Sequence, residues 1–313
     1  MRFLITGGLG FVGSHLTESL IKKNHEVIIL TKSFSKKNNI RNSSKKIKIE
    51  KIDVTKYLPI FNIMKKYKPD VVIHLAGNTS HSKSFENPIA DLDSNTKSTI
   101  ILLESIRKLK LKTKFILGST FIVIGKPSKL PINEKTESNP TTIYGANRLT
   151  SETYCKIYHE VYGIKTNIFR LTNSFGPREQ IIPNKNAVNF LIYSAYKDHK
   201  ISIFNQGEFF RDFIYIDDVI TAINLIIRKG KSGELYWISS GKKIWFKEFA
   251  ILLKKYTKCK VKFVKSPNYT KKVDVGNFVV NNSKLKKLGW KPKVTINHGI
   301  KETLEFFETN SGF

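Results

Sequence analysis

The N-terminal half of the chain alternates short apolar runs with longer stretches in which apolar residues recur at helical spacing. The short runs predict buried strands, and the stretches between them predict amphipathic helices. This order is typical of a parallel sheet covered by helices on both faces. The predicted strands are Arg2–Thr6, Glu26–Leu30, Ile47–Ile52, Asp70–Leu75, Thr113–Leu117 and Lys165–Arg170. The predicted helices are Val12–Lys23, Tyr57–Tyr67, Asp91–Lys110 and Tyr144–Tyr162.

Beyond Arg170 the pattern becomes less regular, with loops rich in Pro, Asn and Gly over 173–186 and 205–211. A strand is predicted at Glu234–Ile238, and helical spacing returns in four later stretches. These stretches are Asp217–Arg228, Trp245–Tyr256, Ser283–Leu288 and His298–Glu308. The polar stretch Lys32–Lys46 predicts a solvated loop. The pattern as a whole predicts a doubly wound α/β sheet with a smaller, irregular lobe.

The composition is that of a globular chain. Its 313 residues are 40% hydrophobic, which is enough to bury a sizeable core. The two cysteines, Cys155 and Cys259, lack the spacing of a metal site and the density of a disulfide framework. No charged leader with an apolar region follows Met1, and no apolar run reaches the roughly 18 residues of a membrane span. We therefore expect a cytoplasmic protein with no metal and no membrane association.

The net charge of +29 raises the question of nucleic-acid binding. Most of the 54 basic residues are Lys, scattered through helices and loops, and no nucleic-acid motif or basic-aromatic ladder accompanies them. We expect no nucleic-acid partner. A basic surface would still attract anionic substrates.

A glycine-rich turn follows the first predicted strand and opens the first helix. Its central residues are Gly7, Gly10, Phe11, Val12 and Gly13. This spacing places backbone N–H groups and the positive helix end against a pyrophosphate, and glycine is needed where backbone and phosphate approach closely. A tight turn without a ligand would look similar. The position of the turn at the start of a βαβ order favours a dinucleotide-binding site.

The ends of the following strands bear on which dinucleotide binds. An NAD-binding chain normally offers Asp or Glu to the adenosine ribose after the second strand. This chain has Thr31, Lys32 and Ser33 there, and hydroxyls with a Lys suit the 2′-phosphate of NADP. We expect NADP, with NAD as the alternative, since Lys32 could simply belong to the many exposed lysines. Further cofactor contacts are expected at Asp53, Val54, Leu75, Ala76 and Gly77.

Further motifs follow in order: Asn95, Ser119-Thr120, Tyr144-Gly145-Ala146-Asn147-Arg148 with Glu152, and the runs 170–178, 211–218 and 288–292. Together with the glycine turn they make nearly the whole chain resemble an extended short-chain dehydrogenase/reductase. The resemblance is to the nucleotide-sugar epimerase and dehydratase branch, which includes UDP-glucose 4-epimerase-like proteins. It implies a Rossmann doubly wound parallel sheet with a smaller, irregular α/β substrate lobe, a cofactor contact at Asn95 and, as in many relatives, a homodimer. We expect a dinucleotide-binding domain over 1–172 with a return of 214–240, and a substrate-binding lobe of 173–213 and 241–313.

The reaction of such a site can be argued from its residue types. Oxidising a sugar alcohol, or reducing a ketone, needs a group that exchanges a proton with the oxygen while hydride moves to or from the nicotinamide. The ordinary pKa of tyrosine, about 10, is too high for a base, so a nearby cation must lower it. The resemblance assigns the proton to Tyr144, a hydrogen bond to the same oxygen to Thr120, and the cation to the residue one helical turn after the tyrosine.

That cation is Arg148, where the family has Lys. Arg keeps the charge and can donate to the nicotinamide ribose, as Tyr144 also would, but it is a planar fork and not a compact ammonium. Three interpretations stay open: a working variant, a slow enzyme, and a cofactor-binding protein without turnover. The retained Thr120 and Tyr144 favour the first.

The resemblance also implies substrate contacts. The nucleotide diphosphate would be held by Asn173, Arg178, Arg211 and Lys271 or Lys272, because charged donors suit phosphate. The sugar would lie near Thr120 and Ser84. As alternatives, Arg211 could pair with a local carboxylate such as Asp212 or Asp217, Asn173 could hold a loop, and the segment 82–84 could be merely solvated.

The residues after Thr120 narrow the reaction. Dehydrating relatives place Asp and Glu there, because eliminating water needs an extra acid and base. Phe121 and Ile122 occupy these positions, which argues against a dehydratase or a decarboxylase. We expect a 4-epimerase that acts through a transient 4-keto sugar, with an NADPH-dependent keto-sugar reductase as the alternative. A non-catalytic NADP-binding member of the family is a second alternative.

Overall fold

The computed structural model describes residues 1–40, 46–182, 187–267 and 272–310. Two compact units can be distinguished along the chain. Unit 1 comprises Met1–Thr120, Ile143–Arg170 and Ile223–Tyr236, and unit 2 comprises Phe121–Thr142, Leu171–Ala222 and Trp237–Phe313.

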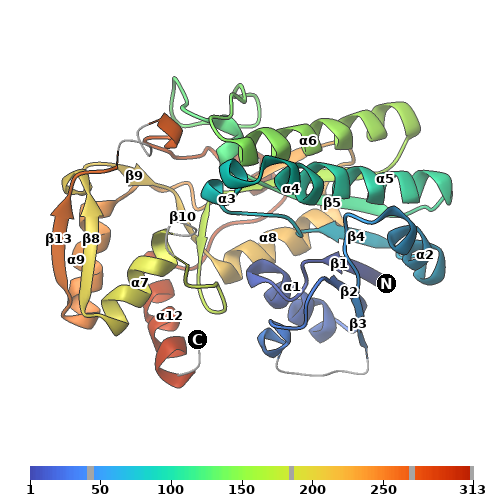
Figure 1. The fold of residues 1–313 in the computed structure, drawn as a ribbon. Helices are drawn as coiled ribbons and strands as arrows, with labels where there is room; N and C mark the ends of the chain where they lie inside the picture. Colours follow the sequence, from blue (N-terminus) through green and yellow to red (C-terminus); the bar gives the residue numbers. More distant parts are fainter. Residues whose placement is uncertain (41–45, 183–186, 268–271, 311–313) are drawn as a thin grey trace. The chain divides into compact units, whose positions relative to one another are not determined.

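A seven-stranded sheet in the order β11-β6-β5-β4-β1-β2-β3 forms the centre of unit 1 (Figure 1). The pairs β1–β2, β1–β4, β2–β3 and β4–β5 are parallel. The order reverses between β1 and β4, which is the crevice where doubly wound sheets bind ligands. The Rossmann-type α/β fold is therefore confirmed. The strands are β1 (Arg2–Thr6), β2 (Glu26–Thr31), β3 (Ile47–Lys51), β4 (Val71–His74), β5 (Lys114–Thr120), β6 (Thr166–Leu171) and β11 (Leu235–Ile238).

Helices cover both faces of this sheet because its central strands are apolar on both sides. Helices α5 and α6 lie together on one face, with α1 and α8 on the other (Figure 1). The side chain of Asn224 on α8 donates to Ser19 on α1 at 3.0 Å. The bounds are α1 (Phe11–Lys22), η1 (Lys37–Asn39), α2 (Tyr57–Tyr67), α3 (His81–Glu86), α4 (Pro88–Leu92), η2 (Asp93–Lys97), α5 (Ser98–Lys108), α6 (Ile143–Tyr162) and α8 (Ile216–Lys229).

The helix predicted at Asp91–Lys110 differs from the observed one. It begins earlier, at Pro88, and its second part, Asp93–Lys97, is a π-helical turn. Such turns insert one residue into an α-helix and are frequent at functional sites. The turn carries Asn95, one of the expected cofactor contacts.

The strand β5 runs three residues further than predicted and includes Thr120. Gly118 makes this continuation possible, because a Cβ there would lie 2.7 Å from the Leu75 side chain and 2.9 Å from the Phe169 ring. The close approach keeps β5 in the sheet up to the residue expected to contact substrate.

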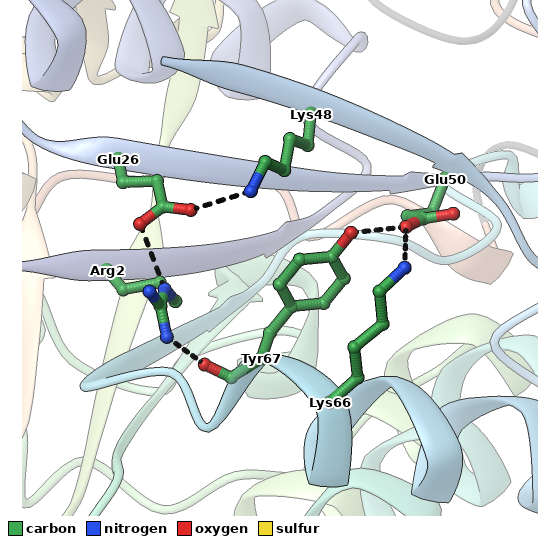
Figure 2. Close-up of polar contacts among 6 residues, drawn as sticks. All are labelled: Arg2, Glu26, Lys48, Glu50, Lys66 and Tyr67. Carbon is green, nitrogen blue, oxygen red and sulfur yellow. Dashed lines mark hydrogen bonds and ion pairs between the residues drawn. The ribbon is translucent and has the colours of Figure 1, made fainter.

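A network of charged side chains attaches α2 to the edge of the sheet (Figure 2). Arg2 donates to Glu26 at 3.0 Å and to the Tyr67 carbonyl at 2.6 Å. The Tyr67 hydroxyl in turn donates to Glu50 at 2.5 Å. Most of these groups are half-exposed, so each ion pair adds little to stability, and the network mainly fixes how α2 lies on the strands. The residues drawn are Arg2, Glu26, Lys48, Glu50, Lys66 and Tyr67.

Unit 2 is built from small paired strands and helices. Strands β7 and β10 pair in parallel, β9 and β12 pair antiparallel, and β8 and β13 pair in parallel. Aromatic rings fill its core, as where Phe209 and Phe246 stack at 4.2 Å. The elements are η3 (Phe121–Ile124), β7 (Asn173–Phe175), α7 (Ala187–Lys197), β8 (Lys200–Phe204), η4 (Asn205–Gly207), β9 (Phe210–Arg211), β10 (Phe213–Tyr215), β12 (Ile244–Trp245), α9 (Phe246–Thr257), β13 (Lys260–Val264), α11 (Ser283–Lys287) and α12 (Ile296–Thr309).

Candidate functional site

The turn between β1 and α1 brings its glycines into close contact. Gly7 has a φ of +70°, and the Gly10 N–H donates to its carbonyl at 2.9 Å. A Cβ on Gly13 would lie 2.2 Å from the same carbonyl oxygen, so a larger residue does not fit there. Helix α1 begins with Phe11 and Val12, without a side-chain cap or an acidic residue in its first turn. Its first N–H groups are therefore available to the phosphates of a dinucleotide.

The ends of β2 and β3 form one polar cluster. The Thr31 hydroxyl donates to the Ser33 carbonyl at 2.6 Å. The Lys32 ammonium lies 3.2 Å from the Asp53 carboxylate, and its side chain is 82% exposed. An ion pair this exposed contributes about 0–1 kcal/mol, so Lys32 can turn to another anion at little cost. Val54 follows Asp53 and is half-buried.

A buried histidine joins the end of β4 to the glycine turn and to α5. The His74 Nδ1 lies 2.6 Å from the Thr6 hydroxyl, which also accepts the Ala76 N–H at 3.1 Å. The Nε2 lies 3.0 Å from the Ser98 hydroxyl, which itself donates to a carbonyl one turn earlier at 2.6 Å. These partners require that Nε2–H donates to Ser98 and that Nδ1 accepts from Thr6. Burial, together with the charge of Arg148, lowers the pKa of His74 to about 3, so the ring is neutral.

Asn95 in the π-helical turn contacts the regions of two other expected cofactor contacts, Gly77 and Arg148. Its Nδ2 donates to the Asn78 carbonyl at 3.3 Å, and its Oδ1 accepts from Arg148 Nη1 at 3.3 Å. A Cβ on Gly77 would lie 2.2 Å from that Oδ1, so only glycine lets the loop pass.

Arg148 is 5% exposed, and its Nε has no hydrogen-bond partner among the described residues. A buried donor without a partner is costly, so a guanidinium in this state is suited to donate to a ligand. The glycine turn, the uncapped α1 and this orphaned N–H together fit a nicotinamide dinucleotide.

Tyr144 and Thr120 come together from α6 and β5, and their side chains are hydrogen-bonded. The ring of His81 on α3 meets the Tyr144 ring edge-on, with centroids 5.6 Å apart. Burial raises the pKa of Tyr144 above its ordinary value, Arg148 and the Thr120 hydrogen bond lower it, and Asp91 raises it again. The net direction is upward, so Tyr144 is protonated before a cofactor or substrate adds its own charge.

A buried ion pair supports the strand end that carries Thr120. Glu152 on α6 and Arg170 on β6 are both almost fully buried, and their closest atoms are 2.7 Å apart. The Ser119 hydroxyl donates to the same carboxylate at 2.5 Å. The end of β5 is thus tied to the helix that carries Tyr144.

The segment expected to face the sugar forms the short helix α3. Ser84 is fully buried, and its hydroxyl donates to the His81 carbonyl at 2.7 Å. Ser82 and Lys83 are exposed. The Ser84 hydroxyl is therefore occupied within its own helix.

The expected diphosphate contacts lie in unit 2. Asn173 begins β7, and its Nδ2 is buried with no hydrogen-bond partner among the described residues. Arg178 follows β7 with a φ of +70° and is half-buried. Arg211 lies on β9 and is buried. Lys271 lies outside the described residues, and its neighbour Lys272 is exposed.

Arg211 does pair with a carboxylate, although with neither of the two considered from the sequence. Its Nη2 donates to Asp274 at 2.6 Å, and its guanidinium lies over the Phe209 ring, 5.2 Å from the centroid. Asp212 instead accepts hydrogen bonds from Ser240, Gly241 and Val280. The Asp274 side chain is half-exposed, so Arg211 keeps one accessible partner that an anionic ligand could replace.

The two residues after Thr120 are apolar, and both are packed against the protein. The Phe121 ring packs edge-on against Phe278 with centroids 5.0 Å apart. Ile122 is buried. These positions hold no acid or base.

Sequence reasoning missed three residues. His81 lies in a Ser- and Lys-rich segment that reads as a loop; the signal was Ser80, which caps α3. Asp91, on α4, was predicted as the first residue of a helix, and its burial was not foreseen. Asp274 stands sixty-three residues from Arg211, beyond the reach of any local pattern.

The described residues contain no group of three or more His, Cys, Asp and Glu side chains that could hold a metal ion. No helix within the same residues is long and apolar enough to cross a membrane.

Comparison with known proteins agrees with this geometry. Residues 4–303 match the profile of the family described as GDP-mannose 4,6 dehydratase. A protein from Methanocaldococcus jannaschii described as a putative UDP-glucose 4-epimerase is 31% identical, and the alignment covers 98% of this chain and 99% of that protein.

Two solved structures are similar over nearly their whole length. The UDP-glucose 4-epimerase of Thermotoga maritima with UDP-glucose superposes with a TM-score of 0.91 at 29% identity, covering 99% of this chain and 100% of that one. The Thermus thermophilus UDP-glucose 4-epimerase in complex with NAD gives a TM-score of 0.89 at 25% identity, covering 98% and 99%.

Proposed function

Since the chain belongs to the GDP-mannose 4,6-dehydratase-like family of NAD-dependent nucleotide-sugar epimerases and dehydratases, we propose that it is a nucleotide-sugar 4-epimerase. One observation carries this proposal. Tyr144 is hydrogen-bonded to Thr120, has the cation Arg148 one turn away, and has no further acid or base at Phe121 or Ile122. This set can move one proton and hold one oxygen, which is all that 4-epimerisation asks of the protein.

The roles of the residues follow from their positions. A nicotinamide cofactor supplies the acceptance and return of a hydride at the sugar carbon. Tyr144, once ionised, takes the proton from the sugar oxygen as the alcohol becomes a ketone, and Thr120 holds that oxygen. After the keto sugar rotates in the site, hydride returns to the opposite face of its C4 carbonyl, and Tyr144 returns the proton to the oxygen. Nothing is consumed, and only the configuration at C4 changes.

For the substrate we propose a nucleotide-diphosphate sugar of the UDP-glucose type. The similar structure from Thermotoga maritima contains UDP-glucose. In this chain the diphosphate is assigned to Asn173, Arg178 and Arg211, with Lys271 or Lys272 as a further cation. The Asn173 Nδ2, which has no partner in the described part of the chain, and the guanidinium of Arg211 are donors of the kind that bind phosphate.

For the cofactor we propose NAD in the epimerase. The similar Thermus thermophilus enzyme is in complex with NAD, and in this chain the Asp53 carboxylate offsets the charge of Lys32. NADP belongs to the second candidate, a keto-sugar reductase. That candidate is favoured by Thr31, Lys32 and Ser33, since the exposed Lys32 can leave Asp53 for a 2′-phosphate at little cost.

The proposal is tested by incubating the purified protein with UDP-glucose and following UDP-galactose by NMR, with and without added NAD. We expect epimer formation, and we expect Tyr144→Phe to lower the rate by about 10²–10⁴-fold while cofactor binding persists. Tyr154→Phe is the matched control, since it removes the same hydroxyl from a half-buried position on the same helix.

Two results would decide otherwise. Stoichiometric loss of NADPH with a keto sugar, without an epimer, would establish the reductase. Cofactor binding without conversion of any nucleotide sugar would establish a non-catalytic protein.

A further inference from the structure

Asp91 is a buried acid that the proposed reaction does not use. It lies on α4 and is 1% exposed. One of its oxygens accepts from Asn78 Nδ2 at 2.7 Å, and the other accepts from Asn147 Nδ2 at 2.7 Å. A carboxylate with an amide donor on each oxygen is held in one orientation.

Both amides belong to segments that carry other site residues. Asn147 lies on α6, between Tyr144 and Arg148, and its backbone carbonyl accepts from Thr96 at 2.9 Å. The backbone carbonyl of Asn78 accepts from Asn95, whose own Oδ1 accepts from Arg148. Asp91 therefore fixes one turn of α6 directly and the partner of Arg148 through one intermediate residue.

Among the described residues, few charged groups act on Tyr144. Arg148 faces it from its own helix, Asp91 from α4, the Thr120 hydroxyl from β5 and the His81 ring from α3. In this set Asp91 is the one carboxylate that acts on Tyr144, and it opposes Arg148.

We propose that Asp91 is a positioning residue of the hydride-transfer site, which holds the Tyr144 turn of α6 through Asn147 and supplies the counter-charge to Arg148. This role rests on the proposed function, because it assumes that Tyr144 is the base. Arg148 and Asp91 then act on the ionisation of Tyr144 in opposite directions, Arg148 from the same helix and Asp91 from α4.

The variant Asp91→Asn tests the counter-charge. It keeps the shape: the new side-chain oxygen still accepts from Asn78, which Ser80 holds in its orientation, and a flip of the Asn147 amide lets the new NH₂ group donate to it. Without the negative charge Tyr144 ionises more easily, so the acidic limb of the pH profile of kcat/KM moves to lower pH by roughly 0.5–1 unit. Arg148→Met moves the same limb to higher pH. The matched control Asp93→Asn removes a half-exposed carboxylate, paired with Lys97 at 3.1 Å, and leaves the limb in place.

The variant Asn147→Ala tests the positioning. It keeps the charge of Asp91 and removes one of its two amide partners, so kcat falls roughly 10-fold or more while the limb stays where it is in the wild type. An Asp91→Asn limb that coincides with the wild type, or an Asn147→Ala variant with unchanged kcat, overturns the proposal.

A second readout needs no turnover and remains valid if the proposed function fails. The ultraviolet absorbance of tyrosinate is followed against pH in the wild type and in Asp91→Asn, each compared with its own Tyr144→Phe derivative. The difference isolates Tyr144, and its ionisation begins at lower pH in Asp91→Asn. If the two midpoints are equal, Asp91 has no such role. If they differ but the wild type epimerises no nucleotide sugar, the proposed function fails and the charge coupling stands.

Discussion

At the scale of single residues, the site depends on the balance around Tyr144. Burial and Asp91 hold the pKa of its phenol up, and Arg148 and Thr120 pull it down. Arg148 differs from the lysine that the family resemblance implies at this position by its fixed, planar set of donors. Its single described hydrogen bond, to Asn95, is long at 3.3 Å, and its Nε has no partner in the described part of the chain. The guanidinium thus keeps donor capacity that a ligand could use.

The buried His74 predicts how the free energy of unfolding depends on pH. Its ordinary pKa of 6.5 falls to about 3 in the folded state, so between these values the unfolded chain binds the proton that the native one excludes. The stability that neutral His74 contributes is complete above pH 6.5 and is lost as the pH falls toward 3, by up to about 1.4 kcal/mol per unit. Denaturant unfolding of the wild type and of His74→Gln at pH 7.5 and 5.0 measures this contribution.

We expect the free energy of unfolding to drop more steeply toward acid in the wild type than in His74→Gln. His199 provides the control, since it is exposed in the structure and His199→Gln should keep the wild-type slope. Equal slopes for the wild type and His74→Gln would show that His74 is not held neutral.

The site residues could be predicted from the sequence where their partners are close along the chain, and could not where the partners are far apart along it. Gly7, Gly10 and Gly13 were predictable because one local turn needs all three. The pairing of Lys32 with Asp53 was not, since it depends on β2 and β3 lying side by side. For Ser84 the residue type suggested a substrate contact, whereas the helix that it enters directs the hydroxyl to a backbone carbonyl.

At the scale of elements, the glycine turn leaves little space for larger side chains. Gly13→Ala places a Cβ 2.2 Å from the Gly7 oxygen, so strand and helix must separate. We expect this variant to lose roughly 1–3 kcal/mol of stability and most of its cofactor affinity. Gly10→Ala is the milder companion, because its Cβ would lie 3.1 Å from the same oxygen at an ordinary φ of −73°. Thermal unfolding and dinucleotide titration check both, and equal stability of the two variants would contradict the contact.

The helices and strands also differ in how well they could be predicted from the sequence. The apolar strands of the central sheet were predicted to within a few residues because burial on both faces leaves long hydrophobic runs. The π-helical turn at Asp93–Lys97 reads as ordinary helix, since it is only five residues long and lies between two helical segments. Short pieces such as α3 and the pair β8–β13 were not predicted, because their stability comes from packing within their units and not from local propensity.

At the scale of the whole molecule, the family relationship extends over nearly the entire chain, from residue 4 to residue 303. The net charge of +29 is therefore a feature of this chain that is separate from the fold it shares with the family. Its expected consequence is attraction of an anionic substrate, which a nucleotide-diphosphate sugar satisfies.

The central claim is that hydride leaves C4 of a nucleotide sugar and returns to the same carbon. It is tested most directly with UDP-glucose carrying deuterium at C4, incubated with the protein and analysed by NMR and mass spectrometry. We expect UDP-glucose and UDP-galactose to form a mixture in which both retain the deuterium at C4, and we expect Tyr144→Phe to convert the substrate about 10²–10⁴-fold more slowly. Loss of the label to solvent, or no conversion of UDP-glucose, UDP-N-acetylglucosamine or dTDP-glucose, would contradict this account.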